Sequence, residues 1–180
     1  MVFGFSPVGA LGHVVRVEVD VRQGLPGTDI VGLPSSEVRE ARDRVRVAVR
    51  NSGYQYPLQR ILVSLSPAEL PKVGSGFDLP IALALLERSG QITLPGDVLA
   101  SGELSVRGEV VPVRGTLSAV LAAVDRGIPA VVLGTRGAGV LGRHRPSDAT
   151  ILATPSLREL RKKGFSHEMV VPATTDKASR

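Results

Sequence analysis

The sequence predicts an α+β fold, a mixed sheet with helices packed on it. Short runs of branched residues that alternate with polar ones predict strands, and longer segments with apolar residues every three or four positions predict helices. Strands and helices mixed in this irregular order are typical of α+β domains. The chain has 180 residues, 43% of them hydrophobic, which is enough for one domain with a sizeable core.

The first half begins with a clear strand pattern in residues 13–24. Val15, Val17 and Val19 alternate there with charged residues, so one face of the strand is predicted to be buried and the other solvated. A second strand is predicted over 28–33. A helix is predicted over 37–51, with Ser35 or Ser36 as its N-cap.

The second half of the sequence predicts further strands and helices. A strand is expected over 61–66 and a helix over 77–88, with Asp78 capping the helix start. A hairpin follows, with strands 99–104 and 109–113 on either side of residues 106–108. We then expect a helix over 116–125, strands over 130–133 and 151–153, and a short helix over 156–163. Residues 134–148, rich in Gly and Arg, predict a loop. Periodicity stops after Gly164, so residues 165–180 predict a tail or linker.

Composition narrows the class of protein. The absence of cysteine excludes disulfides and thiolate metal sites, and the three scattered histidines indicate no metal site. There is no signal-peptide pattern and no apolar run near the roughly 20 residues that span a bilayer, so we expect a cytoplasmic protein without a membrane partner. The net charge of +5 suits a nucleic-acid partner. Aromatic content of 3% argues against binding dominated by base stacking.

Four segments recur in order in one known family. They are GLPGTDIVGLP (24–34), EVREARDRVRVAVRNSG (37–53), LSPAELPKVGSGFDLPIAL (65–83) and GELSVRGEVVPVRGTLSAVLAA (102–123). They resemble the N-terminal domain of ComM/YifB-type magnesium-chelatase-like AAA+ ATPases, over about residues 3–160. The resemblance implies a Lon-protease-like domain over 1–164 and a linker over 165–180 toward an ATPase module outside this chain.

The same resemblance implies a function. Members of the ComM/YifB-type family are hexameric motors linked to DNA branch migration and natural transformation. This chain would then be an accessory part that assists assembly or grips DNA, with its own ATPase module, DNA and further copies of itself as partners. ATP and magnesium would belong to the ATPase module, and no cofactor is expected in this chain.

The likeness to Lon implies where a catalytic Ser–Lys dyad would fall. The nucleophile position holds Gly76 and the lysine position holds Leu117, and neither side chain can do the chemistry. We therefore predict no catalytic residue and no enzymatic activity for this chain. An alternative is a divergent serine protease that uses Ser75 with Lys72, although Lys72 is more simply read as solvated and Ser75 as part of a turn.

The stretch PKVGSGFD also resembles an anion-binding loop. Lys72, Gly74, Ser75 and Gly76 precede a predicted helix, and the backbone N–H groups of such a turn can hold phosphate, as in kinase-like domains. Asp78 opposes this because it would repel phosphate, and no Gly-Lys-Ser/Thr sequence is present. The other interpretation is that both glycines serve the backbone turn.

The predicted helix 37–51 carries a basic stripe made of Arg39, Arg42, Arg46 and Arg50. Spacings of three and four place them on one face. The stripe is a candidate site for DNA or for an acidic partner surface. The alternative is a solvated face on which Asp43 pairs with Arg39 and Arg46. A third interpretation of the chain is an oligomerisation module without a ligand.

Overall fold

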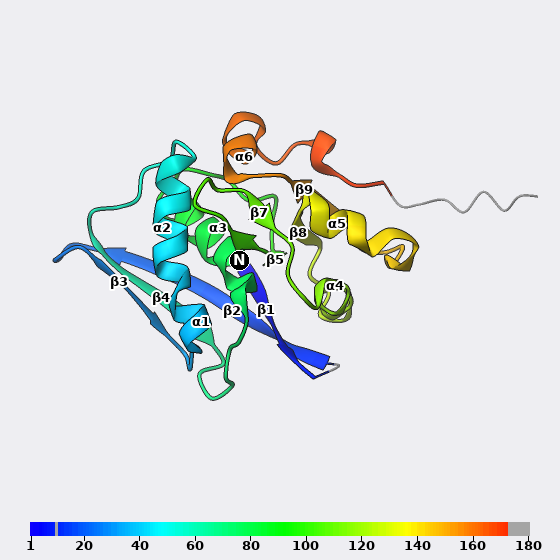
Figure 1. The fold of residues 1–180 in the computed structure, drawn as a ribbon, viewed down its shortest axis with the longest axis horizontal. Coiled ribbons are helices and arrows are strands. Elements are labelled where there is room, and N and C mark those ends of the chain that lie inside the picture. The colour runs from blue at the N-terminus through cyan, green and yellow to red at the C-terminus, as the bar shows by residue number, and fades with distance from the viewer. Residues whose placement is uncertain (10, 173–180) are drawn as a thin grey trace, which may run out of the picture.

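The chain forms a seven-stranded sheet with helices on both faces, shown as a computed structural model in Figure 1. The structure describes residues 1–9 and 11–172, so the end of the predicted tail, 173–180, lies outside the described residues. The strands lie in the order β3, β4, β2, β1, β5, β8 and β9. Their bounds in that order are Gly27–Val31, Arg60–Ser66, Leu11–Arg22, Val2–Val8, Val98–Ser101, Ala130–Gly134 and Ile151–Thr154.

The sheet is mixed, which confirms the predicted fold class. β2 runs antiparallel to β1 and β4, and the other neighbouring pairs are parallel. The sequence did not predict β1, because Gly4 and Pro7 are poor strand residues. β1 forms because β2 and β5 pair with it on both sides. Gly4 also leaves room for a neighbour, since a Cβ there would lie 2.8 Å from the Phe77 ring.

Helices cover the two faces of the sheet in separate layers. α2 (Ala41–Asn51), α3 (Asp78–Arg88) and α6 (Leu157–Lys163) bury side chains in one core cluster. α4 (Thr116–Asp125) and α5 (Thr135–Leu141) bury theirs in a second cluster on the opposite face (Figure 1). Alternate residues of β8 enter the two clusters, so this strand is buried on both sides.

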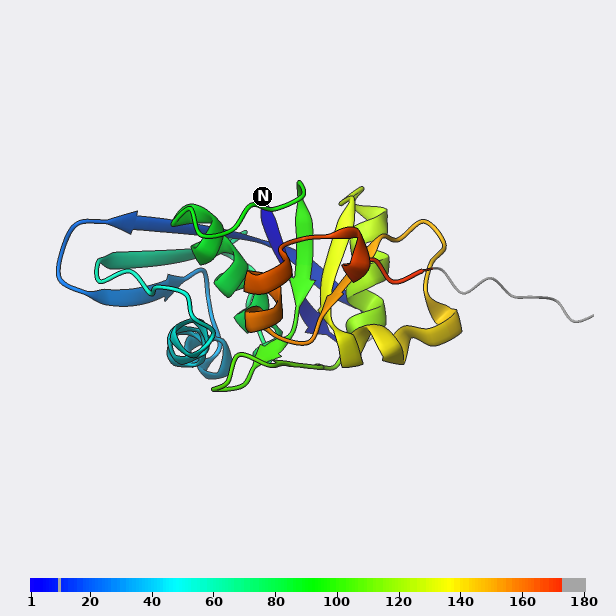
Figure 2. The same ribbon diagram turned by 90° about the horizontal axis from the view of Figure 1, so that it is seen from above.

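β2 shows the predicted alternation. Val15 and Val17 are buried in the α3 cluster, whereas Arg16 and Glu18 are exposed on the other face. β1 pairs with β2 only as far as Val17, so the second half of β2 pairs with β4 alone. Figure 2 shows this part, with β3 and β4, extending to one side with α2 against one face. The opposite face carries the exposed side chain of Leu62.

The predicted helix 37–51 is interrupted. A short helix, α1, covers Ser36–Arg39, and α2 begins after Glu40. Ser35 is the N-cap of α1, and its hydroxyl accepts the Val38 N–H at 3.2 Å. The first of the two predicted caps is therefore confirmed, and the single continuous helix is wrong.

The predicted hairpin strand 99–104 is divided at Gly102. β5 ends at Ser101 and joins the large sheet, while β6 (Glu103–Leu104) pairs with β7 (Val110–Val111) in a two-stranded sheet. A Cβ on Gly102 would lie 2.5 Å from Val110 Cγ1, so this close approach requires glycine. The turn at 106–108 between the two strands follows the prediction.

Two further predictions for the C-terminal half are corrected. Residues 134–148, expected as a loop, contain α5 and the 3-10 helix η2 (Gly142–His144). α5 forms because Ala138 and Leu141 are buried in the core, and this packing outweighs the low helix propensity of its glycines. The start of the predicted tail folds back as η3 (His167–Met169), and Val170 pairs with Leu152 of β9. None of the helices within the described ranges is long and apolar enough to span a membrane.

Candidate functional site

Three of the four arginines of the predicted stripe line one pocket of about 400 Å³. Arg42, Arg46 and Arg50 stand on α2 at spacings of four residues, about one turn apart, and all three are exposed. We call this cavity the arginine pocket. Its lining residues are Pro26, Gly27, Thr28, Arg42, Asp43, Arg46, Arg50, Tyr56, Pro57, Leu58 and Arg60.

The fourth arginine of the stripe lies outside the pocket. Arg39 belongs to α1 and is exposed, and the break at Glu40 separates it from the arginines of α2. Arg60, the first residue of β4, lines the pocket instead. The sequence gives no signal for Arg60, because no helical period relates it to α2. Only the pairing of β3 with β4 brings it to this site.

Tyr56 is the aromatic residue of the arginine pocket. Its hydroxyl lies 2.6 Å from the Thr28 hydroxyl, and the Arg50 guanidinium lies 5.9 Å from the centre of its ring. This distance permits a cation–π attraction that holds Arg50 at the pocket. Burial raises the pKa of the Tyr56 phenol, while the hydrogen bond with Thr28 and the nearby arginines oppose this rise.

The charges around the pocket are partly paired. Arg46 binds Asp43 at 3.2 Å, as predicted, and Arg60 binds Asp29. Arg39 forms no ion pair with Asp43 or with any other residue in the described ranges, so that predicted pair is wrong. Exposed pairs of this kind contribute little to stability, and a guanidinium keeps other N–H donors for a phosphate or carboxylate.

A second pocket lies at the glycine-rich loop and has a volume of about 440 Å³. Gly74, Ser75 and Gly76 line it where the 3-10 helix η1 (Ser75–Phe77) leads into α3. We call this cavity the serine pocket. Its lining residues are Phe5, Pro7, Glu37, Val73, Gly74, Ser75, Gly76, Ser101, Pro112, Val113 and Arg114.

The region that contains the arginine pocket matches a known family. The profile described as subunit ChlI of Mg-chelatase aligns with residues 17–136, more than half of the chain. The chain belongs to this ChlI family. The matched range also includes the loop of the serine pocket and all of α3, so the family assignment rests on the same segments that form both pockets.

Two relatives of this ChlI-family chain are proteins of Escherichia coli and Haemophilus influenzae. YifB of Escherichia coli is 46% identical over 129 residues, which cover 71% of this chain and 26% of YifB. The competence protein ComM of Haemophilus influenzae is 41% identical over 125 residues, 68% of this chain and 25% of ComM. The chain therefore spans about a quarter of the length of these relatives.

A more distant similarity connects the ChlI-family chain to Lon. The Lon protease of Geobacter metallireducens is 26% identical over 136 residues, 72% of this chain and 16% of that protein. This relation is consistent with the predicted Lon-like α+β fold. Gly76 lines the serine pocket, whereas Leu117 is the second residue of α4, 37% exposed, and is not among the lining residues.

Lys72 is fully buried in the ChlI-family chain, so its interpretation as a solvated side chain is wrong. Its ammonium group donates a hydrogen bond to the Pro67 carbonyl and forms none with Ser75. Burial lowers the pKa of Lys72, and the charge of Glu69 opposes this shift. The geometry therefore does not bring Lys72 and Ser75 together as a nucleophile and its base, because the two must lie within hydrogen-bond reach.

Asp78 does not cap α3, which corrects the predicted role. The N-cap position is Phe77, and the fully buried Asp78 carboxylate accepts bonds from Arg44 and from the Leu104 N–H. Burial raises the pKa of Asp78, and the bonds from Arg44 and Leu104 oppose that rise. Asp78 thus joins α2, α3 and β6 and is not directed at a ligand.

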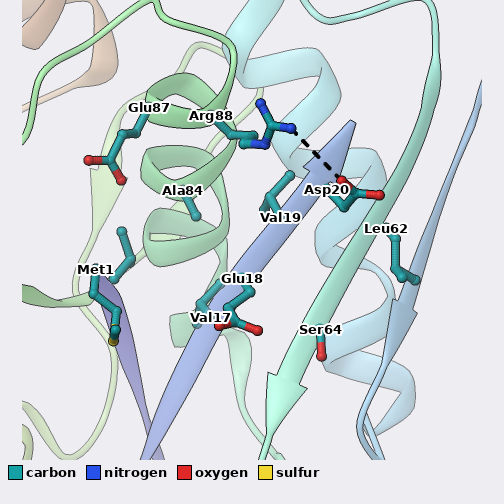
Figure 3. Close-up of a pocket in the computed structure, with 11 residues that line it drawn as sticks. Met1, Val17, Glu18, Val19, Asp20, Leu62, Ser64, Ala84, Glu87 and Arg88 are labelled. Carbon is teal, nitrogen blue, oxygen red and sulfur yellow. Dashed lines mark ion pairs between the residues drawn. The ribbon is translucent and has the colours of Figure 1, made fainter. Parts of the chain in front are cut away.

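A further cavity of about 740 Å³ lies beside the half of β2 that pairs with β4 alone (Figure 3). Arg88 of α3 reaches across it toward Asp20, with a nitrogen–oxygen distance of 3.9 Å. Glu18 and Glu87 also line this cavity. Within the described ranges no group of three or more His, Cys, Asp or Glu side chains is placed so that it could hold a metal ion.

Proposed function

We propose that this chain is the N-terminal accessory part of a longer ComM/YifB-like AAA+ ATPase and that it binds DNA without catalysing a reaction. The contact would be made by Arg42, Arg46 and Arg50 of α2 together with Arg60 of β4. The relation to ComM and YifB supports the architecture, because the chain spans only about a quarter of those proteins. The arginine pocket supports the contact with DNA.

The observation that carries this proposal is the convergence of four arginines on one cavity. Guanidinium groups bind phosphate oxygens through paired N–H donors and remain charged at any physiological pH. One turn of α2 separates successive arginines, so several phosphates of one strand can be contacted together. Arg39, exposed on α1, extends the basic surface beyond the pocket.

The proposed binding is weak and independent of base sequence. Contacts made by arginine to phosphate carry no base information. Non-specific binding of this kind has dissociation constants of about 10⁻⁴ to 10⁻⁶ M at physiological salt. Several copies joined in one assembly would bind more tightly through avidity. A hexamer, as the family resemblance implies, would supply such copies.

The rest of the function belongs to the proposed longer protein. An ATPase module that follows this chain would bind ATP and magnesium and supply the motor. ComM carries the name competence protein, and by analogy we propose roles in DNA branch migration and natural transformation within the cytoplasm. In this account the chain assists assembly or DNA engagement and is not itself an enzyme.

Charge reversal on the two faces of the sheet tests the DNA contact. Arg46→Glu places a negative charge in the arginine pocket, and Arg16→Glu makes the same change on the opposite face of β2. We expect fluorescence anisotropy with labelled duplex or branched DNA to show roughly tenfold weaker binding for Arg46→Glu and a much smaller effect for Arg16→Glu.

Among the described residues both arginines pair only with exposed carboxylates, so neither change should unfold the chain. Equal losses of affinity in the two variants would show that net charge alone matters and would contradict the assignment of the site. An absence of DNA binding by the unchanged chain at low salt would overturn the proposed function itself.

A further inference from the structure

The serine pocket is lined by the hydroxyl of Ser101, for which the described residues provide no hydrogen-bond partner. Ser101 ends β5 and is only 7% exposed. It lines the serine pocket, and its hydroxyl forms no hydrogen bond with the residues that the structure describes. A hydroxyl that faces a cavity and has no protein partner can donate to, or accept from, a ligand or water in that cavity.

Gly76 keeps the space beside this hydroxyl open. A Cβ at residue 76 would lie 3.2 Å from Ser101 Oγ and 3.2 Å from Val113 Cγ2. Any side chain at this position would therefore crowd the hydroxyl and the pocket wall. Gly76 does not have the positive φ that Gly74 shows, so its role here is to leave room rather than to permit a turn.

The same position supplies backbone donors. Ser75 and Gly76 are the first two residues of η1, which continues directly into the 11-residue helix α3. The first N–H groups of a helix have no acceptor within it. They also carry the positive end of the helix dipole. Four donors therefore surround one cavity. They are the backbone N–H groups of Ser75 and Gly76 and the hydroxyls of Ser75 and Ser101.

The charges near the pocket limit which anion it can take. Arg114 lines the pocket and attracts an anion, but Glu37 lines it as well. The Asp78 carboxylate in the first turn of α3 is paired with Arg44, so Glu37 is the acidic residue that opposes an anion at this pocket. Glu37 repels a dianionic phosphate more strongly than a single carboxylate, which carries half that charge. The balance favours a monoanion.

The rest of the pocket surface is apolar. It is lined by Phe5, Pro7, Val73, Pro112 and Val113. Apolar walls with a few convergent donors are typical of sites for small organic ligands, and such sites have volumes of about 300 to 1,000 Å³. A ligand that matches both parts has a carboxylate at one end and an aliphatic group beside it.

We propose that the serine pocket binds a carboxylate attached to a small aliphatic group, such as the C-terminal residue of a peptide. The Ser75 and Gly76 amides and the Ser101 hydroxyl donate to the carboxylate oxygens, and the aliphatic group contacts Phe5 and Val113. No covalent step is involved. This site is separate from the arginine pocket and does not depend on DNA binding.

Amide NMR with simple probes tests the proposal. The probes are acetyl-Ala-Val with a free carboxylate, the same peptide ending in an amide, isovalerate and inorganic phosphate. We expect the free peptide acid to shift the Ser75, Gly76 and Ser101 amide signals with millimolar affinity, and the peptide amide to bind at least tenfold more weakly. If isovalerate binds as well as the peptide acid, the ligand is a free aliphatic acid. If the peptide acid binds more tightly than isovalerate, the ligand is the C-terminal end of a peptide.

Two variants and one control locate the binding. Ser101→Ala loses no hydrogen bond within the described chain, so this variant is expected to fold normally. Its affinity for the peptide acid should fall about tenfold. Gly76→Ala is expected to abolish binding by filling the space beside Ser101, and Ser64→Ala, in β4 and outside the serine pocket, should change nothing. The melting temperature of each variant verifies folding. Equal binding of acid and amide, unchanged affinity in Ser101→Ala, stronger binding of phosphate, or no shifts would overturn the proposal.

Discussion

Arg44 binds both carboxylate oxygens of Asp78, with Nε to Oδ2 at 2.7 Å and Nη2 to Oδ1 at 3.1 Å. The same guanidinium donates to the Glu37 carbonyl and pairs with Glu40. This arrangement fixes the start of α3, which borders the serine pocket, to α2, which carries the arginine pocket. The two candidate sites are therefore built on one connected group of elements.

Loss of Arg44 should destabilise the fold strongly. Arg44→Ala leaves the fully buried Asp78 carboxylate with only the Leu104 N–H as a partner, and breaking a buried pair in this way costs about 3 to 5 kcal/mol. Arg42→Ala is the matched control, because that side chain is exposed on the same helix. It should change stability by less than about 0.5 kcal/mol. Urea unfolding of both variants measures the difference, and similar losses would contradict a structural role for the Arg44–Asp78 pair.

The two tyrosines should respond differently to removal of their hydroxyls. Tyr54 is buried and its hydroxyl has no partner among the described residues, whereas Tyr56 is bonded to Thr28. At pH 7 we expect Tyr56→Phe to lose about 1 kcal/mol of unfolding free energy and Tyr54→Phe to lose almost none.

Tyr54 also predicts a dependence on alkaline pH. Burial raises the pKa of its phenol to about 12 from the ordinary value of 10.0. Between those two pH values the unfolded chain releases a proton that the folded chain retains, so stability present below pH 10 is lost as pH rises. In Tyr54→Phe the fall in unfolding free energy between pH 10 and pH 12 should be smaller than in the parent by up to about 2 kcal/mol. If the unfolding free energies of the variant and the parent change equally with pH in this range, the pH dependence does not come from the Tyr54 phenol.

Gly74 should be sensitive to substitution for reasons of backbone conformation. It has φ of 90°, in the region that favours glycine, so Gly74→Ala should cost more than about 1 kcal/mol. Gly139, exposed inside α5, is the control, since nothing lies within 4 Å of a Cβ built there. Gly139→Ala should be neutral or stabilising by up to about 1 kcal/mol. Equal melting temperatures for the two variants would contradict the turn requirement at Gly74.

Restoring the side chains of a Lon-like dyad should not create a peptidase. In Gly76→Ser with Leu117→Lys, the new Cβ would crowd Ser101 and Val113, and position 117 does not line the serine pocket. Activity needs the nucleophile, its base and the oxyanion donors in register. We expect casein to remain intact with this variant and with the unchanged chain. Cleavage by the unchanged chain that Ser75→Ala abolishes would establish the protease alternative.

The elements that follow local rules were predictable from the sequence. The alternation in β2 and the cap at Ser35 depend on neighbouring residues and are present in the structure. β1 and α5 were missed because long-range pairing and burial stabilise them against weak local propensity. Gly139, for example, lies inside α5 although glycine favours loops.

The candidate sites were only partly predictable for the same reason. Helical spacing identified Arg42, Arg46 and Arg50 but could not reveal the break that removes Arg39. Arg60 reaches the arginine pocket through the pairing of β3 with β4, and Ser101 reaches the serine pocket through the end of β5. A charged residue such as Lys72 carries no local mark of burial, so its enclosure was unexpected.

The salt dependence of DNA binding tests the central claim most directly. The slope of log affinity against log salt concentration counts the phosphates that the chain contacts. Arg46→Ala with Arg50→Ala should flatten this slope by up to about two units, since each lost contact releases about one fewer counterion. Arg16→Ala with Arg126→Ala, which removes the same charge from exposed residues outside the arginine pocket, should leave the slope unchanged. If the two double variants and the parent give the same slope, or the parent does not bind at low salt, the arginine pocket is not a DNA site.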